Sequence, residues 1–403
     1  MWFFFSPKII YGPDSLDFFE NITGKKCFIV TDKILEDLGY VKILTDRLAK
    51  FGKEWEVFTD VEPDPKEESI LKSKEKCLAY SPDIIVGLGG GSVMDVAKGL
   101  WAVYEYPKYG IDDFYPFNQD LYDLGKKAKM VAIPTTSGTG AETTWAVIIS
   151  RLEPEGNIKV WKKFEQAHKG LIPMYAIVDP IFPIGMPPNL TSGTGFDALA
   201  HSIEGLTSVW KNEFSDAMCL KAIELIFNFL PLAYKDGKNE KARDMMHQAA
   251  TIAGLGFGNS QAHIGHTLGH VWGSLYHIPH GTCVGLFLPY ITQYCLNNPD
   301  EKDPTAKILA KLAKQLAWVN WNEDDKKAAK VVIDKIKQLQ KDVDLPSKLA
   351  DTGVSREEMD KNMDNLISLC FQSSSLTMAP RSANAEELQK LFEYAYEGKD
   401  VDF

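Results

Sequence analysis

The sequence predicts two domains of different class: an α/β domain with a mostly parallel sheet over residues 1–180, and an all-α domain over residues 181–403. Up to about residue 180, short apolar runs alternate with helix-periodic segments, which is typical of βαβ units. After that point almost every segment carries helical periodicity. At 403 residues the chain also exceeds one typical hydrophobic core.

Three short apolar runs and one alternating segment, Glu54–Asp60, predict the strands of the α/β domain. They are Lys26–Asp32, Glu54–Asp60, Asp83–Leu88 and Lys129–Pro134. Between them, residues 33–51, 66–80 and 93–106 have the periodicity of helices. The apolar start, residues 1–8, is too short for a signal sequence and predicts an edge strand.

Two loops that follow predicted strands are rich in glycine and hydroxyl side chains, namely Gly87–Ser92 and Thr135–Gly140. Consecutive glycines let backbone N–H groups approach a diphosphate, and the N-terminus of the next helix favours its negative charge. The first loop lacks the last glycine of the G-x-G-x-x-G fingerprint, so ordinary turns are the alternative. Together the two loops predict a nucleotide at the carboxyl ends of the strands.

Three charged residues lie near these loops, and for Asp32 the sequence leaves two interpretations open. Asp32 ends the first strand, where a carboxylate can bind a ribose diol or, alternatively, cap the next helix. Asp95 and Lys98 lie one turn apart on the helix after the glycine loop, and a surface ion pair is the simplest explanation of that spacing. The spacing alone leaves both interpretations open.

The second half contains nine segments with helical periodicity. They are 194–210, 213–233, 239–257, 260–275, 284–296, 304–318, 324–341, 355–372 and 384–397. A connection that contains Pro183, Pro187 and Pro188 separates them from the α/β half.

Histidines gather in one stretch of this helical half. The chain has eight histidines, and five of them fall between residues 261 and 281. His266 and His270 are four apart, so they share one face of a helix. Pro279 then predicts the end of that helix and places His280 in a turn. Polar histidines at a helix end would be the simplest explanation of the cluster alone.

An earlier helix adds a carboxylate, because Asp197 and His201 are also four apart. One carboxylate and several imidazoles from two segments predict a mixed N/O site for a divalent ion with an open position, which is the pattern of a catalytic metal. The metal and the nucleotide would then meet across a cleft between the two domains.

The composition excludes several classes of protein. The net charge is −11 without a long basic run, which argues against a nucleic-acid or anionic-membrane partner. No segment was expected to be apolar over the roughly 18 residues that a membrane span needs. The six cysteines are scattered without a Cys-x-x-Cys pair, which indicates buried, reduced thiols and a cytoplasmic location.

Five motifs occur together along the chain. They are Gly-Gly-Gly-Ser-x-x-Asp-x-x-Lys at 89–98, Pro-Thr-Thr-Ser-Gly-Thr-Gly-Ala-Glu at 134–142, Met-Pro-Pro at 186–188, Gly-Phe-Asp-Ala-Leu-Ala-His-Ser-Ile-Glu at 195–204 and His-x3-His-x9-His-Gly at 266–281. This set resembles the iron-dependent (group III) alcohol dehydrogenases over essentially the whole length. The resemblance implies the dehydroquinate synthase-like fold, with an α/β N-terminal nucleotide-binding domain and an all-α C-terminal metal-binding domain.

The resemblance also implies roles for individual residues. The implied metal ligands are Asp197, His201, His266 and His280. His270 matches a further active-site histidine close to the reacting carbon, whereas His263 and His277 fall outside the ligand pattern. The implied cofactor contacts are Asp32, Gly90, Gly91, Ser92, Asp95, Thr135, Thr136, Ser137 and Lys163, the last being less direct because residues 152–160 look like a small insertion.

The implied reaction interconverts a primary alcohol and its aldehyde with NAD(H) and Fe²⁺, or Zn²⁺, in a homodimer or higher homo-oligomer. The resemblance does not carry over the substrate, because the family's His-Ala-x-Ala-His-Pro-Leu-Gly is His-Thr-Leu-Gly-His-Val-Trp-Gly at 266–273. A small polar or anionic aldehyde is an alternative substrate, and its possible donors are Lys163, His168, Lys169, His263, His277 and Arg381. A solvated basic loop is the simpler explanation of the lysines. A dehydroquinate synthase-like lyase would require Glu in place of Asp197, and a glycerol dehydrogenase relative or a non-catalytic binding protein would not need the full ligand set.

Overall fold

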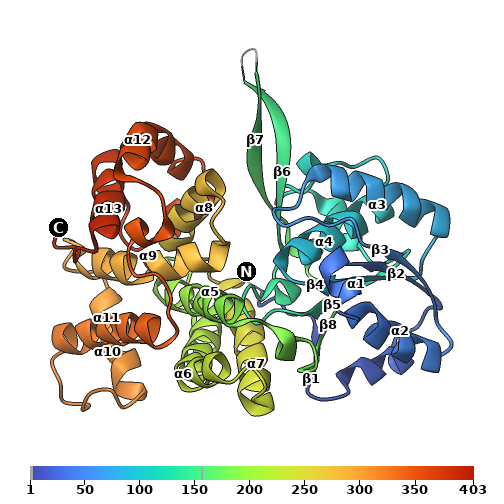
Figure 1. Cartoon of the computed structure of the whole chain (residues 1–403), viewed down its shortest axis with the longest axis horizontal. Coiled ribbons are helices and arrows are strands. Elements are labelled where there is room, and N and C mark those ends of the chain that lie inside the picture. The colour runs from blue at the N-terminus through green and yellow to red at the C-terminus, as the bar shows by residue number, and fades with distance from the viewer. Residues whose placement is uncertain (1–2, 156–157) are drawn as a thin grey trace. The chain divides into compact units, whose positions relative to one another are not determined.

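A computed structural model describes residues 3–155 and 158–403 of the chain (Figure 1). The chain forms two compact units, Met1–Ile184 and Gly185–Phe403. Unit 1 is α/β and unit 2 is helical, which confirms the predicted fold class. The sequence placed the boundary after residue 180, just before the short 3₁₀ helix η6 (Pro183–Gly185).

Unit 1 is built on a six-stranded sheet in the order β1-β8-β5-β4-β2-β3, in which every neighbouring pair is parallel. The strands are β1 (Lys8–Tyr11), β2 (Lys26–Val30), β3 (Glu54–Phe58), β4 (Ile84–Gly89), β5 (Lys129–Pro134) and β8 (Tyr175–Val178). The apolar start of the chain is not the edge strand: residues 3–7 are irregular, and the edge strand β1 begins only at Lys8.

Helices cover both faces of this sheet, so its central strands are apolar throughout. In β2, Phe28 and Val30 pack with α3 (Glu67–Tyr80) and α4 (Gly91–Glu105), whereas Cys27 and Ile29 pack with α2 (Tyr40–Lys50). The single helix predicted over 33–51 is two helices, α1 (Lys33–Asp37) and α2. Gly39 separates them with a left-handed φ of 82°.

A long antiparallel hairpin of β6 (Ala146–Glu155) and β7 (Ile158–Ala167) forms a second, two-stranded sheet (Figure 1). The sequence identified only an insertion at 152–160 here, and residues 156 and 157 of that insertion lie outside the described residues. Neither strand has the simple alternation that predicts a half-buried strand.

Unit 2 consists of helices around one core. They are α5 (Pro188–Thr207), α6 (Glu213–Lys235), α7 (Glu240–Phe257), α8 (Ile264–Tyr276), α9 (His280–Leu296), α10 (Thr305–Gln315), α11 (Asp325–Asp342), α12 (Arg356–Cys370) and α13 (Ala385–Glu397). Two prolines begin helices, whereas the sequence predicts a connection at Pro188 and the end of a helix at Pro279, with His280 in a turn. Pro188 is the first residue of α5 and Pro279 is the N-cap of α9, positions where the missing N–H costs nothing.

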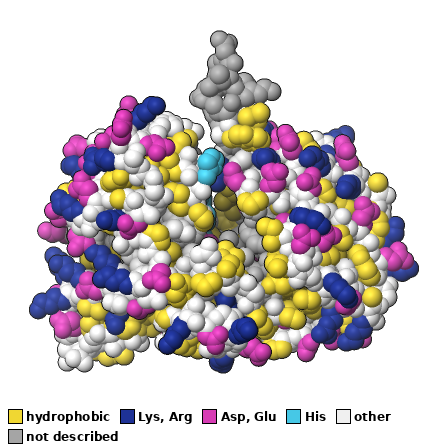
Figure 2. Space-filling model, in the orientation of Figure 1, with side chains coloured by type: hydrophobic (Ala, Val, Ile, Leu, Met, Phe, Trp, Pro, Cys, Tyr) yellow, Lys and Arg dark blue, Asp and Glu magenta, His cyan; other side chains and the backbone are white. Residues whose placement is uncertain are grey.

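Helix α6 corrects one expectation from composition, since it is long and apolar enough to cross a membrane by length and composition alone. Its inward residues, such as Ile223 and Ile226, are fully buried in the core of unit 2. All six cysteines are free and buried, as predicted. On the face drawn in Figure 2, basic and acidic side chains are interspersed and no large basic area is seen.

Candidate functional site

The two loops that predict a nucleotide site lie where the strand order of the sheet reverses. After β2 the chain adds β3 on one side and returns to place β4 on the other, so β2 and β4 flank a topological switch point. Ligands of open α/β sheets bind beyond the carboxyl ends of the strands at such a point. Asp32 follows β2, and Gly90 follows β4.

The glycine loop and the hydroxyl loop lie against each other. The N–H of Thr135 donates to the carbonyl of Gly89 at 3.0 Å. A Cβ on Gly90 would lie 3.3 Å from Oγ1 of Thr136, and one on Gly91 would lie 3.0 Å from Cγ2 of Thr139. Small residues at 90 and 91 therefore let the two loops meet at the N-terminus of α4, where helix N–H groups favour an anion.

Asp32 is the N-cap residue of α1, which is one of the two interpretations that its sequence position allowed. Its Oδ1 accepts the N–H of Leu35 at 2.9 Å. This bond uses one carboxylate oxygen and does not test contact with a ribose.

Asp95 and Lys98 are not a surface ion pair. Lys98 is fully buried, and its Nζ donates to the carbonyl of Ala146 at 3.0 Å and to Oγ1 of Thr144 at 3.3 Å. Burial lowers the pKa of Lys98 to about 8 and raises that of Asp95 to about 7, and each charge partly opposes the shift of the other. Lys98 thus anchors the start of β6 to α4.

Three of the donors suggested for an anionic substrate have other partners. Lys163 is 3.1 Å from Oδ1 of Asp64. His168 is buried in unit 1, where its Nδ1 accepts the N–H of Gly170. Arg381 donates to main-chain carbonyls, including that of Phe403 at 2.8 Å, and to Oε1 of Glu387. The structure therefore brings no support to a substrate-binding role for these three residues.

In unit 2, one carboxylate oxygen lies close to three imidazoles from three helices. Oδ1 of Asp197 on α5 is 3.6 Å from Nδ1 of His201, which lies one turn further on. It is 3.7 Å from Nε2 of His266 on α8 and 3.3 Å from Nε2 of His280 on α9. Ligands at about 2.1 Å from a tetrahedral ion are separated by about 3.4 Å. The spacing therefore matches atoms around an ion better than direct hydrogen bonds.

Three of these four atoms have no hydrogen-bond partner among the described residues although they are buried: Oδ1 of Asp197, Nδ1 of His201 and Nε2 of His266. Each such atom costs about 1–3 kcal/mol. The ligand atoms of these three residues lie within 4.8 Å of one another, and His280 completes the set with a partly exposed side chain. This donor set fits a divalent ion such as Zn²⁺ or Fe²⁺.

The protonation of the cluster also fits a cation. Burial lowers the pKa of His201 to about 3 and that of His280 to about 4. Burial also favours the neutral ring of His266, but the carboxylates of Glu204 and Asp197 outweigh it and raise that pKa to about 10. At neutral pH an ion would therefore displace a proton mainly from His266.

The other three histidines of the 261–281 stretch lie around this cluster in different ways. His270 is partly exposed, with its ring centroid 4.6 Å from that of His280. His263 is the buried N-cap residue of α8, and its Nε2 is 2.9 Å from Oγ1 of Thr207. His277 is exposed and ends α8 with a left-handed φ of 55°.

Sequence reasoning missed one residue of the cluster, Glu204. Its carboxylate is fully buried, and its Oε1 is 2.8 Å from Nδ1 of His266. Glu204 lies seven residues after Asp197, and this two-turn spacing on one helical face was the available signal.

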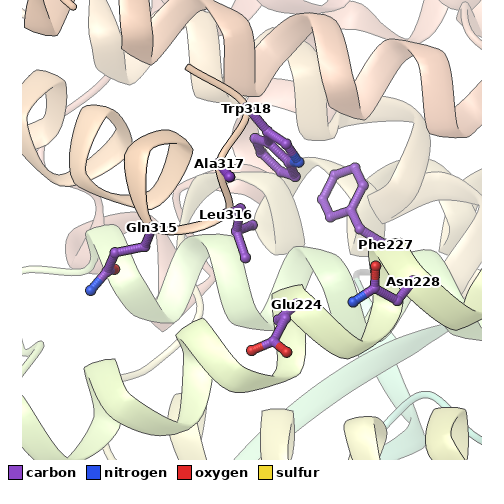
Figure 3. A pocket seen from close by; sticks show the side chains of 7 residues that line it. All are labelled: Glu224, Phe227, Asn228, Gln315, Leu316, Ala317 and Trp318. Atoms are coloured by element: carbon purple, nitrogen blue, oxygen red, sulfur yellow. The ribbon is translucent and has the colours of Figure 1, made fainter. Parts of the chain in front are cut away.

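A hollow elsewhere in unit 2 contains none of the clustered histidines (Figure 3). Glu224, Phe227 and Asn228 of α6 line it together with residues 315–318 at the end of α10. The rings of Phe227 and Trp318 meet edge to face at 4.7 Å.

The sequence of both units matches described family patterns. Residues 6–180 match "Iron-containing alcohol dehydrogenase", and residues 191–396 match "Fe-containing alcohol dehydrogenase family, C-terminal". The chain belongs to the iron-containing alcohol dehydrogenases. It is therefore an oxidoreductase that interconverts alcohols and aldehydes.

Relatives of this alcohol dehydrogenase include proteins of about the same length and longer, bifunctional proteins. It is 34% identical over 398 residues to the NADPH-dependent butanol dehydrogenase of Clostridium saccharobutylicum, covering 98% of both chains. It is 34% identical to the bifunctional aldehyde-alcohol dehydrogenase of Escherichia coli but spans only 46% of that protein. The solved alcohol dehydrogenase from Oenococcus oeni superposes with a TM-score of 0.87 at 28% identity, over 98% of this chain and 100% of that one.

Proposed function

We propose that this enzyme holds one divalent ion with Asp197, His201, His266 and His280 and interconverts a primary alcohol and its aldehyde with NAD(H). The observation that carries the proposal is the convergence of three buried, unpaired ligand atoms beside His280. The family name favours iron, whereas the general affinity order favours zinc at equal supply.

The protein residues would place and hold the reacting groups. When bound, the ion supplies Lewis acidity toward the substrate oxygen, and the nicotinamide supplies or accepts hydride. Asp197 offers a negative ligand that lowers the net charge of the site, and three neutral imidazoles complete it. His270, beside His280, would move the proton that the hydroxyl group releases or takes up.

Purified enzyme loaded with Fe²⁺ or Zn²⁺ is expected to oxidise NADH when given short aliphatic aldehydes such as butanal. Absorbance at 340 nm measures the rate, with an aldehyde that carries a sulfonate compared in the same assay. We expect kcat/KM to be higher for butanal than for the sulfonate, because Lys163 and Arg381 already pair with Asp64 and Glu387 and are not free to bind an anion. No NADH or NADPH oxidation with any aldehyde, together with a metal-loaded protein, would contradict the proposed reaction.

We also propose a preference for NADH over NADPH, which rests on Asp32. A 2′-phosphate beside its carboxylate would bring like charges together at a cost of several kcal/mol. Each ~1.4 kcal/mol is tenfold in affinity, so the ratio of kcat/KM for NADH and NADPH should fall on the order of 10²-fold in Asp32→Gly.

Asp32→Asn is the matched control for that experiment, because an amide oxygen can still cap α1 through Leu35 while the charge is lost. The asparagine variant should also use NADPH better than wild type. If wild-type enzyme uses both cofactors equally, as the NADPH dependence of the clostridial relative allows, Asp32 is a helix cap only.

A homodimeric state and a cytoplasmic location stay predictions of the proposal. The first has support in the exposed aromatic side chains of Phe3 and Tyr11 near the edge strand β1. Light scattering of the purified enzyme measures that state.

A further inference from the structure

Glu204 is a buried carboxylate whose partners all come from one turn of another helix. It belongs to α5 and is fully buried, as is its neighbour Ser202. Among the described residues, its side chain contacts Nδ1 of His266 at 2.8 Å and the N–H of His263 at 2.5 Å. A buried carboxylate is costly unless it is hydrogen-bonded, so these contacts account for its presence.

The carboxylate joins the main chain and the side chain of the same turn. Its Oε2 accepts the N–H of His263 at 2.5 Å and that of His266 at 3.4 Å, while its Oε1 faces Nδ1 of His266 at 2.8 Å. His263 is the N-cap residue of α8, and no side chain of its own caps that helix. Glu204 therefore caps α8 from α5 and contacts a proposed ligand with its other oxygen.

Gly265 provides the space for this contact. A Cβ at position 265 would lie 2.5 Å from Oε1 and 3.1 Å from Cδ of Glu204. Any side chain there would push the carboxylate away from α8. Position 265 therefore requires glycine because of the space that Glu204 occupies, and not because of its backbone conformation.

The orientation of the His266 ring follows from the bond to Glu204. A carboxylate can only accept, so Nδ1 of His266 must donate the hydrogen. Nε2, which faces Oδ1 of Asp197 at 3.7 Å, is then the nitrogen that gives up its proton and offers its lone pair to an ion. We propose that Glu204 is a positioning residue that fixes the tautomer and orientation of His266 and docks α8 on α5, so that metal affinity depends on it. This inference rests on the proposed metal site.

Metal affinity distinguishes a residue that only caps a helix from one that also positions a ligand. Glu204→Gln keeps the size of the side chain and one acceptor for the main chain. Its single amide oxygen cannot also accept from Nδ1 of His266. Partners of metal-bound histidines typically change metal affinity 10- to 100-fold, so the variant should bind Zn²⁺ about that much more weakly while remaining folded.

Ser355→Ala is the control, because Ser355 caps α12 in the same unit by accepting the N–H of Glu358 and touches no ligand. Zn²⁺ affinity is measured by competition with a chelating dye, and the visible spectrum of the Co²⁺ form reports ligand geometry. Weaker Zn²⁺ binding and an altered Co²⁺ spectrum in Glu204→Gln, with neither change in Ser355→Ala, support the inference.

Wild-type Zn²⁺ affinity in a folded Glu204→Gln would overturn it and leave Glu204 as a cap. Gly265→Ala provides the same test if the glutamine variant does not fold: it should also weaken Zn²⁺ binding, and unchanged affinity overturns the inference. Failure of wild-type enzyme to bind Zn²⁺, Co²⁺ or Fe²⁺ would overturn the proposed function itself, which distinguishes the two results.

Discussion

Replacing His280 by alanine is expected to abolish activity and most metal binding while the enzyme stays folded. His280 is 3.3 Å from Oδ1 of Asp197 and is the most exposed member of the proposed ligand set. Its removal leaves three ligands and little packing defect. Lewis-acid catalysis supplies several kcal/mol, so kcat/KM should fall on the order of 10³-fold or more.

His277→Asn is the matched control for this loss. His277 lies in the same connection, is exposed, and has a left-handed φ that asparagine tolerates. His263 is a poorer control, because it is buried and bonded to Thr207. Metal content of the purified variants, measured by elemental analysis, should be near one ion per chain in His277→Asn and far below it in His280→Ala. Equal content in both would refute the ligand assignment.

Replacing His270 by alanine is expected to lower kcat on the order of 10²- to 10⁴-fold, the range for lost acid–base catalysis, without loss of metal. Its ring lies beside His280 at 4.6 Å and one helical turn after His266, yet it is partly exposed. A proton can therefore pass between this ring and solvent. Measurements of kcat across pH and of metal content separate this role from ligation.

Two results would assign His270 another role. If His270→Ala loses its metal together with its activity, the residue is a ligand or holds one. If kcat is unchanged across pH, it takes no part in proton transfer. Added imidazole should partly restore the rate of the alanine variant, because it can occupy the space of the missing ring.

The sequence predicted most of the elements that repeat a simple pattern. The parallel strands β2, β3, β4 and β5 were predicted from apolar runs or alternation within two residues of their observed bounds. Asp197 and His201 were paired by helical spacing alone, and that spacing survives in α5. The joining of α5, α8 and α9 at one point came from family resemblance, because periodicity carries no information on which helices meet.

The features that were missed depend on contacts between distant segments. Lys98 looks like a surface lysine in its own helix, and only the start of β6 provides the acceptors that allow its burial. Pro188 was assigned to the connection between the two halves, although the first turn of α5 needs no N–H there. Glu204 is the last residue of the motif at 195–204. Its partners lie at the start of α8, so its role is visible only in the folded chain.

The distribution of the proposed ligands over three helices has a consequence for folding. Asp197 belongs to α5 and is separated by α6 and α7 from the consecutive helices α8 and α9 that carry His266 and His280, and all three residues lie in unit 2. An ion held by them would act as a removable cross-link, and its binding free energy would add to the unfolding free energy of that unit. Metal supply would then determine how long unit 2 stays folded as well as whether the enzyme is active.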